Sequence, residues 1–124
     1  MPVAILRQGN YLIASIQSDL SDREVIELRN ELANLVGQHR LRGIVIDVAA
    51  LDVIDSFVTR ALSTIVSTAK LRGAETVIVG IHPDVAIAMV QFRLNLKPLR
   101  VALDLDAATA LLDQLIGGDA KDGG

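Results

Sequence analysis

The chain has 124 residues, a length that suits one domain with a hydrophobic core of its own. It contains no cysteine, which excludes disulfides and thiolate metal sites, and its formal net charge is −3. Charges of both signs are spread along the chain and aromatic residues make up only 2%, so we expect no nucleic-acid binding. No apolar run reaches the roughly 18 residues that a membrane span needs, and no signal-peptide pattern is present. We therefore expect a cytoplasmic protein without a membrane segment.

The first part of the chain predicts a β-hairpin followed by a helix. Two β-rich runs, at 3–6 and 11–16, are separated by turn-forming residues, a pattern typical of paired strands. Ser21 and Glu24 have the spacing of a capping box, so we expect a helix to begin there. Apolar residues then recur at helical spacing up to Gly37, which is placed to end the helix.

The rest of the chain alternates between strand-like and helix-like segments. An unbroken β-branched run at 43–48 is typical of a central parallel strand that is buried on both faces. The other elements are expected as follows: a helix at 56–71 closed by Gly73, a strand at 76–79, a helix that begins near Pro83, a short edge strand at 99–101, and a last helix that Asp104 caps. The core face of the last helix is expected to contain Leu105, Ala108, Leu111, Leu112 and Leu115.

This order of elements predicts an α/β fold. Strand–helix–strand units require right-handed crossovers, so we expect a mixed, mostly parallel sheet of about five strands with about four helices. Residues 1–116 would form the domain, and 117–124 a flexible C-terminal tail. In parallel sheets, functional residues gather beyond the carboxyl ends of the strands, which here means segment 49–59.

Residues that could carry out catalysis are sparse. His39 and His82 lie far apart, and the sequence has neither a glycine-rich phosphate loop nor a recognisable Ser-His-Asp arrangement. We therefore expect no enzymatic activity, no cofactor and no metal. Asp47, Asp52 and Asp55 leave one alternative open, because three carboxylates near a strand end could hold Mg²⁺ or accept a phosphoryl group as a receiver domain does. Turn and cap residues are the simpler interpretation of the same three.

Ser56, at the start of the predicted helix 56–71, is the predicted site of phosphorylation. Either Asp55 or Ser56 is the N-cap, because both side chains can accept hydrogen bonds from free backbone amides. A phosphate on Ser56 would carry about −1.5 to −2 charges, and the helix start would stabilise it locally. Thr59, one turn further along, is a weaker candidate acceptor.

One face of the same helix is built mainly of small hydroxyl residues and carries little charge, which is typical of a protein contact surface. Helical spacing predicts a core stripe made of Val58, Ala61, Leu62, Ile65 and Ala69. The predicted partner surface consists of Asp52, Asp55, Ser56, Phe57, Arg60, Ser63 and Ser67. At an effective dielectric constant near 20, two charges about 4 Å apart interact by roughly 4 kcal/mol, so a phosphate on Ser56 would weaken a docked contact by several hundredfold.

Several short runs, together with the order of the elements, carry a family resemblance. The most specific runs are 45–47, 53–57 and 70–74, and the likeness extends from about Ile5 to Leu115. They resemble the STAS family of anti-anti-sigma regulators, and within it the RsbS-type stressosome scaffolds. The resemblance implies the STAS fold and a non-catalytic role in stress signalling.

The resemblance also implies partners. Ser56 would be phosphorylated by a serine/threonine switch kinase of the RsbT type, which the unphosphorylated scaffold sequesters by assembling with itself and with RsbR-type STAS co-antagonists. Phosphorylation would release the kinase, and a phosphatase would reset the system. A free antagonist of an anti-sigma factor that controls transcription is the alternative. Many such antagonists have a small residue and a glycine after the serine, whereas Phe57 and Val58 follow Ser56 here, which favours the scaffold branch.

Overall fold

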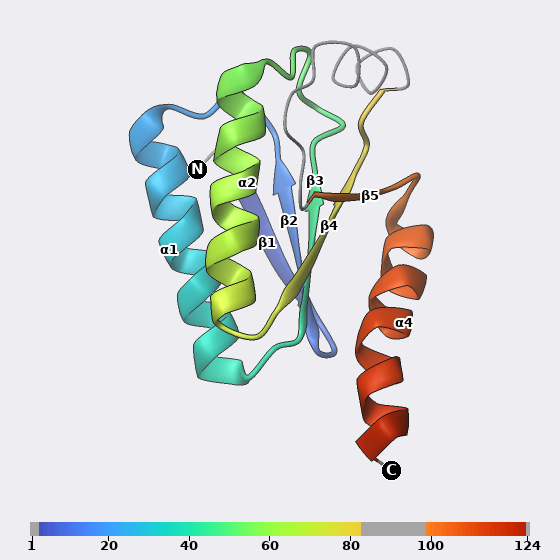
Figure 1. Cartoon of the computed structure of the whole chain (residues 1–124). Coiled ribbons are helices and arrows are strands. Elements are labelled where there is room, and N and C mark those ends of the chain that lie inside the picture. Colours follow the sequence, from blue (N-terminus) through green and yellow to red (C-terminus); the bar gives the residue numbers. More distant parts are fainter. Residues whose placement is uncertain (1–2, 83–98, 124) are drawn as a thin grey trace.

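The structure of the chain, a computed structural model, describes residues 3–82 and 99–123, with side chains described as far as residue 117 (Figure 1). The predicted helix that begins near Pro83 lies outside these residues. The elements in chain order are β1 (Val3–Gln8), β2 (Tyr11–Ile16), α1 (Asp22–His39), β3 (Gly43–Asp47), α2 (Ser56–Leu71), β4 (Glu75–Val79), β5 (Arg100–Ala102) and α4 (Leu105–Gly123).

The five strands form one sheet in the order β1-β2-β3-β4-β5. β1 runs antiparallel to β2, and β2 to β5 are parallel to their neighbours. The predicted mixed, mostly parallel sheet is therefore confirmed, and so is the placing of the short last strand at an edge. β1 is two residues longer than predicted because it pairs with β2 along its whole length, from Val3 opposite Ile16 to Gln8 opposite Tyr11.

The sheet lies between two helical layers (Figure 1). α1 and α2 lie side by side on one face and begin at the same end of the molecule, while α4 covers the other face. Both faces of β3 are covered, so Ile44, Val45 and Ile46 are fully buried, as their unbroken apolar run predicts. Ile44 and Ile46 belong to the core under α1 and α2, and Val45 belongs to the core under α4.

The predicted start of α1 is confirmed, but its predicted end is wrong. The Ser21 hydroxyl accepts a hydrogen bond from the Glu24 amide, and the Glu24 carboxylate accepts one from the Ser21 amide, so the capping box is complete and lowers the pKa of Glu24. The helix continues through Gly37 and ends at Arg40, which is left-handed with φ 51°. Gly37 lies beside the end of α2, since a Cβ there would be 3.3 Å from the Arg72 guanidinium.

The start of α4 follows the prediction, and its later course does not. The Asp104 carboxylate accepts a hydrogen bond from the Ala107 amide (2.9 Å), so Asp104 caps the helix. Ala108 and Leu112 are fully buried, whereas Leu105 is exposed and is not a core residue. The backbone is helical up to Gly123, where we expected a frayed tail from Gly117 onward. That residues 117–124 are a flexible tail outside the domain stays a prediction.

Candidate functional site

The segment between β3 and α2 begins at the carboxyl end of β3 and is fixed there by its neighbours. The Val48 amide donates a hydrogen bond to the Val79 carbonyl (3.0 Å), and the Ala49 amide donates one to the Asp47 carboxylate (2.9 Å). Gly80 follows β4 with φ +84°, and a Cβ on it would lie 2.7 Å from the Ala49 nitrogen. Glycine at this position therefore lets the end of β4 approach the loop backbone.

The start of α2 decides which residue is the cap. The Asp55 carboxylate accepts a hydrogen bond from the Val58 amide (3.0 Å), so Asp55 is the N-cap and Ser56 is the first helical residue. The Ser56 side chain is exposed. Thr59 is only 3% exposed, and its hydroxyl donates a hydrogen bond to the Asp55 carbonyl (2.9 Å), so it is turned inward. Ser56 is therefore the accessible hydroxyl of the two candidate acceptors.

The polar face of α2 lies largely where helical spacing predicts it. Ser56, Arg60 and Ser67 are exposed, and Ser63 is half-buried. The apolar side chain that ends this face is Leu71, which helical spacing places at the border of the core stripe and which is 89% exposed. Its exposure agrees with helical spacing, because positions four apart on a helix share a face and Leu71 is four residues after Ser67.

The buried stripe of α2 is rotated relative to the prediction. Leu62, Ile65 and Ala69 are buried as expected, but the other two predicted core residues, Val58 and Ala61, are only half-buried. Their places are taken by Thr59 (3% exposed) and Val66 (5% exposed). The rotation leaves room beside Val58 and Ala61, where α2 faces the first turn of α1.

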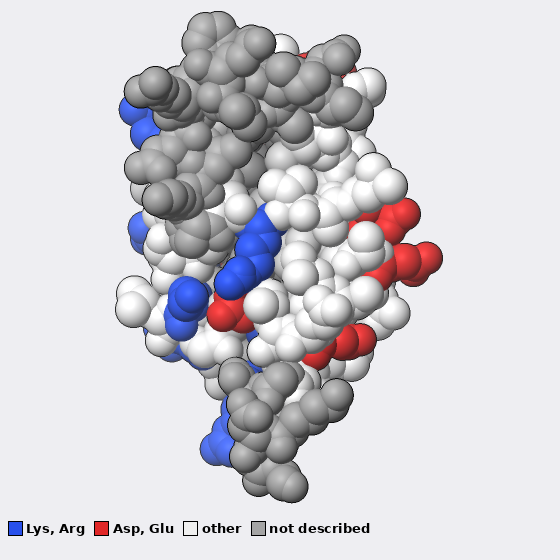
Figure 2. Space-filling model, turned by 45° about the vertical axis from the view of Figure 1, so that its right-hand side comes forward, with Lys and Arg blue, Asp and Glu red and all other residues white. Residues whose placement is uncertain are grey.

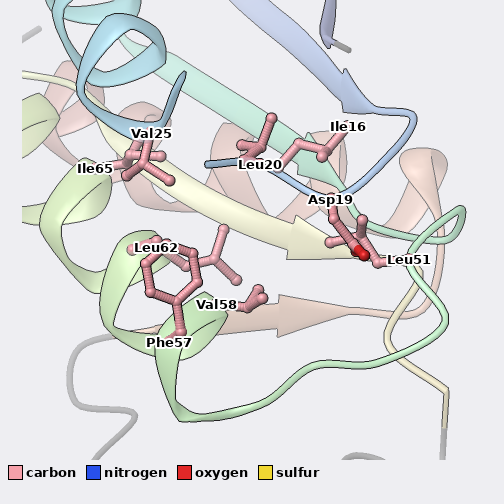
Figure 3. Close-up of a pocket in the computed structure, with 10 residues that line it drawn as sticks. Ile16, Asp19, Leu20, Val25, Leu51, Phe57, Val58, Leu62 and Ile65 are labelled. Carbon is pink, nitrogen blue, oxygen red and sulfur yellow. The ribbon is translucent and has the colours of Figure 1, made fainter. Parts of the chain in front are cut away.

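That room is an apolar pocket between the first turns of α1 and α2 (Figure 3). It encloses about 320 Å³ of space that no atom fills, part of it open to solvent, and its enclosed part is small. Its walls come from the end of β2, the start of α1, the β3–α2 loop and α2, and they include Leu20, Val25, Leu51, Phe57 and Ala61, with Asp19 as its charged residue. Phe57 is half-buried and turned toward Leu62, so it lines this pocket (Figure 3).

Three aspartates were candidates for holding a metal ion or accepting a phosphoryl group. Two of them accept hydrogen bonds from backbone amides, and the third is exposed to solvent. The Asp47 carboxylate accepts a hydrogen bond from the Ala49 amide, and the Asp55 carboxylate accepts one from the Val58 amide. Asp52 is exposed in the loop. Within residues 3–82 and 99–123, no group of three acidic or histidine side chains is close enough together to hold a metal ion.

The charged side chains visible on the α4 side of the molecule do not form a continuous basic stripe among the described residues (Figure 2). Lys and Arg side chains stand apart there, with uncharged surface and acidic groups between them. His39 and His82 are both exposed. In the part of the chain that the structure describes, no helix has the length and apolar character needed to cross a bilayer.

Comparison with protein families gives a match to the STAS domain over residues 2–108. Among solved structures, a variant of RsbS from Moorella thermoacetica is 35% identical, with a TM-score of 0.76, covering 94% of this chain and 98% of that one. A chain from a structure described as the molecular architecture of the stressosome, a signal integration and transduction hub, is 37% identical, with a TM-score of 0.75, covering 91% and 98%.

More distant structures share the fold alone. The anti-sigma factor antagonist SpoIIAA in its unphosphorylated form is 10% identical with a TM-score of 0.63, covering 93% of this chain and 98% of that one. A comparison with curated proteins gave no match. The family match spans most of the chain, and two relatives are more than 30% identical over nearly their whole length. The chain therefore belongs to the STAS domain family.

Proposed function

We propose that the chain is a non-catalytic scaffold of stress signalling that holds a serine/threonine switch kinase and releases it when Ser56 is phosphorylated. The observation that carries this proposal is the position of Ser56, which is exposed as the first residue of α2, directly after the Asp55 cap. A kinase can reach a hydroxyl there without unfolding the domain.

The electrostatics of this position favour a switch. The α2 N-terminus carries a partial positive charge, so a phosphate on Ser56 is stabilised locally and the fold need not change. A partner docked beside it would nevertheless meet about −1.5 to −2 new charges next to the exposed carboxylates of Asp52 and Asp55. Repulsion and desolvation of the phosphate then weaken the contact.

The partner surface predicted from the sequence remains the proposed kinase-binding face, except that Phe57 lies at its edge. Arg60 is its basic residue, and Ser63 and Ser67 continue it along α2. Phe57 lines the pocket at the edge of this surface, so its ring would contact a partner only from the side.

Two relatives support the proposal. One of them comes from the architecture of the stressosome, which supports self-association of this chain. RsbR-type STAS co-antagonists are the further partners in our proposal. The other is an RsbS variant with glutamate in place of a serine, numbered two positions later in its own chain than Ser56 is here. A glutamate there imitates part of the charge of phosphoserine, as a switch at Ser56 requires.

Phosphorylation is tested by intact mass after incubation with an RsbT-type kinase and ATP. The wild-type chain should gain one phosphate and Ser56→Ala none, while Ser18→Ala, which removes an exposed serine outside the proposed kinase-binding face, should be labelled like the wild type. Continued labelling of Ser56→Ala would contradict the assignment. An acid-labile acyl phosphate on Asp47 or Asp52 would instead favour the receiver alternative.

Kinase release is tested by comparing the affinity of an RsbT-type kinase for Ser56→Glu and for Ser67→Glu. Ser56→Glu should weaken binding at least tenfold, although a glutamate has less charge than a phosphate, and Ser67→Glu should weaken it less. Equal affinity of wild type and Ser56→Glu would remove the electrostatic switch. A tight one-to-one complex with an anti-sigma factor, without larger assemblies, would favour the free antagonist instead.

The reset of the switch is tested with a phosphatase of the same signalling system. Chain phosphorylated on Ser56 should lose the phosphate and recover its affinity for the kinase.

A further inference from the structure

The two ends of the α1/α2 layer carry opposite charges. At the end where both helices begin, segments 17–24 and 48–60 contain five acidic and two basic residues, a net charge of −3. At the end where both helices finish, segments 38–43 and 70–75 contain four basic residues and one acidic residue, a net charge of +3. We call these the acidic end and the basic end. Figure 1 shows that they lie at opposite ends of the same helical pair.

Each end also carries an apolar feature. At the acidic end this is the pocket between the first turns of α1 and α2, with Asp19 in its wall and Asp52 next to Leu51, another wall residue. At the basic end it is Leu71, the last residue of α2, which is 89% exposed and stands between exposed Lys70 and Arg72. The first feature is a hollow with an acidic border, and the second is a projection with basic neighbours.

We propose that the chain associates head to tail, with Leu71 at the basic end of one copy seated in the apolar pocket at the acidic end of the next. The inference deepens the self-association in the proposed function and rests on it. The contact cannot form within one copy, because the 16 residues of α2 separate the two features by about 24 Å at 1.5 Å per residue. The two surfaces are different, so the contact is heterologous and builds a ring or an open chain.

The chemistry of the two ends fits this contact. The Leu71 side chain is apolar and so is most of the pocket lining, so contact between them removes apolar surface of both from water. Because the enclosed part is small, the side chain would enter tip first. Lys70 and Arg72 would then lie beside Asp19 and Asp52 of the next copy, and opposite potentials steer such encounters.

Helix dipoles explain part of the charge pattern but not all of it. Acidic residues at helix starts and basic residues at helix ends are stabilising in any helical protein. The dipole does not explain why a leucine at the end of α2 is exposed, nor why an apolar hollow remains open at the start of α1 and α2. Burying both apolar surfaces at once is what the head-to-tail contact adds.

The first test is sedimentation velocity of the full chain over a dilution series. Leu71→Glu should weaken self-association at least tenfold, and raising the salt concentration should weaken that of the wild type. Leu103→Glu is the matched control, since Leu103 is 86% exposed but lies between β5 and α4, and it should associate like the wild type. A wild-type chain that stays monomeric, or a Leu71→Glu chain that associates like the wild type, would overturn the proposal.

Mixing two variants tests the direction of the contact. Leu71→Glu keeps an intact pocket, and the double variant Asp19→Lys/Asp52→Lys keeps an intact Leu71, so the mixture should form a one-to-one dimer that neither variant forms alone. If the mixture yields no such dimer, the head-to-tail arrangement is wrong.

A kinase assay on Leu71→Glu separates this inference from the proposed function. Normal phosphorylation of Ser56 in a variant that no longer self-associates supports both. If self-association follows the prediction but Ser56 is not phosphorylated even in the wild type, the head-to-tail contact is supported and the proposed switch at Ser56 is wrong.

Discussion

Thr59 and Thr76 are both buried, but their hydroxyl groups have different surroundings. The Thr59 hydroxyl donates to the carbonyl of the cap residue Asp55 (2.9 Å), which joins the second turn of the helix to its start. The Thr76 side chain is 2% exposed, and its hydroxyl has no hydrogen-bond partner among the described residues. Thr76 precedes Ile78 by two residues in β4, so both point into the core beneath α1 and α2.

The two threonines should respond in opposite ways to valine. Thr76→Val removes a buried hydroxyl that lost its water without gaining a partner, so the free energy of unfolding should rise by about 1 kcal/mol. Thr59→Val removes a hydrogen bond and should lower the free energy of unfolding by about 1 kcal/mol. Urea unfolding of both variants measures the difference. A Thr76→Val protein less stable than the wild type would show that its hydroxyl is satisfied.

Among the elements, the loop between β3 and α2 has the most direct effect on the position of Ser56. Its start is held by hydrogen bonds from Val48 and Ala49, and Gly80 lies against it from the end of β4. Gly73, at the end of α2, also has a positive φ (+93°), but a Cβ on it would meet nothing within 4 Å. The two glycines therefore share a backbone conformation and differ in how closely other atoms approach.

This difference predicts the outcome of substituting each glycine by alanine. Gly73→Ala should cost about 1 kcal/mol of stability, because the left-handed conformation is unfavourable for any residue with a Cβ. Gly80→Ala should cost at least about 1 kcal/mol more, since its Cβ would also lie 2.7 Å from the Ala49 nitrogen. It should also slow phosphorylation of Ser56 by displacing the loop. Thermal unfolding and kinase rates test this, and equal behaviour of the two variants would contradict it.

At the scale of the whole molecule, α4 closes the second face of the sheet. Ala108 and Leu112 pack on Val45 and Val77, and the Tyr11 hydroxyl at the start of β2 donates a hydrogen bond to the Asp113 carboxylate on α4. This bond joins residues that lie 102 positions apart in the sequence. Burial, the hydrogen bond and the charge of Asp113 raise the pKa of Tyr11 from 10.0 to about 12.

The raised pKa predicts how stability depends on pH in alkaline solution. Tyr11 is neutral in both states below pH 10, so its contribution is fully present there, and it is lost as the pH rises through about 12, because the unfolded chain ionises first. Tyr11→Phe should remove this part of the loss of folding stability at alkaline pH.

The chain has one tyrosine and no tryptophan, so ultraviolet absorbance reports the titration of Tyr11 directly. Asp113→Asn should move the Tyr11 pKa back toward 10.0, because it removes the negative charge beside the phenol. An unchanged titration in this variant would mean that Asp113 does not act on Tyr11.

The sequence by itself determined the local elements and the start of the site. The bounds of α2, the capping box of α1, the Asp104 cap and the buried run of β3 follow from residue chemistry within a few positions along the chain. The exposure of Ser56 and the polar face of α2 follow from helical periodicity.

Only the tertiary structure decided which neighbours cover each face. Periodicity locates a helix face to within about one residue, so it could not distinguish Val58 from Thr59 as the buried residue. In the same way, only the tertiary structure shows that Gly37 of α1 lies beside Arg72 and that Leu71 is 89% exposed. These outcomes depend on residues far apart in the chain, which no local pattern can place.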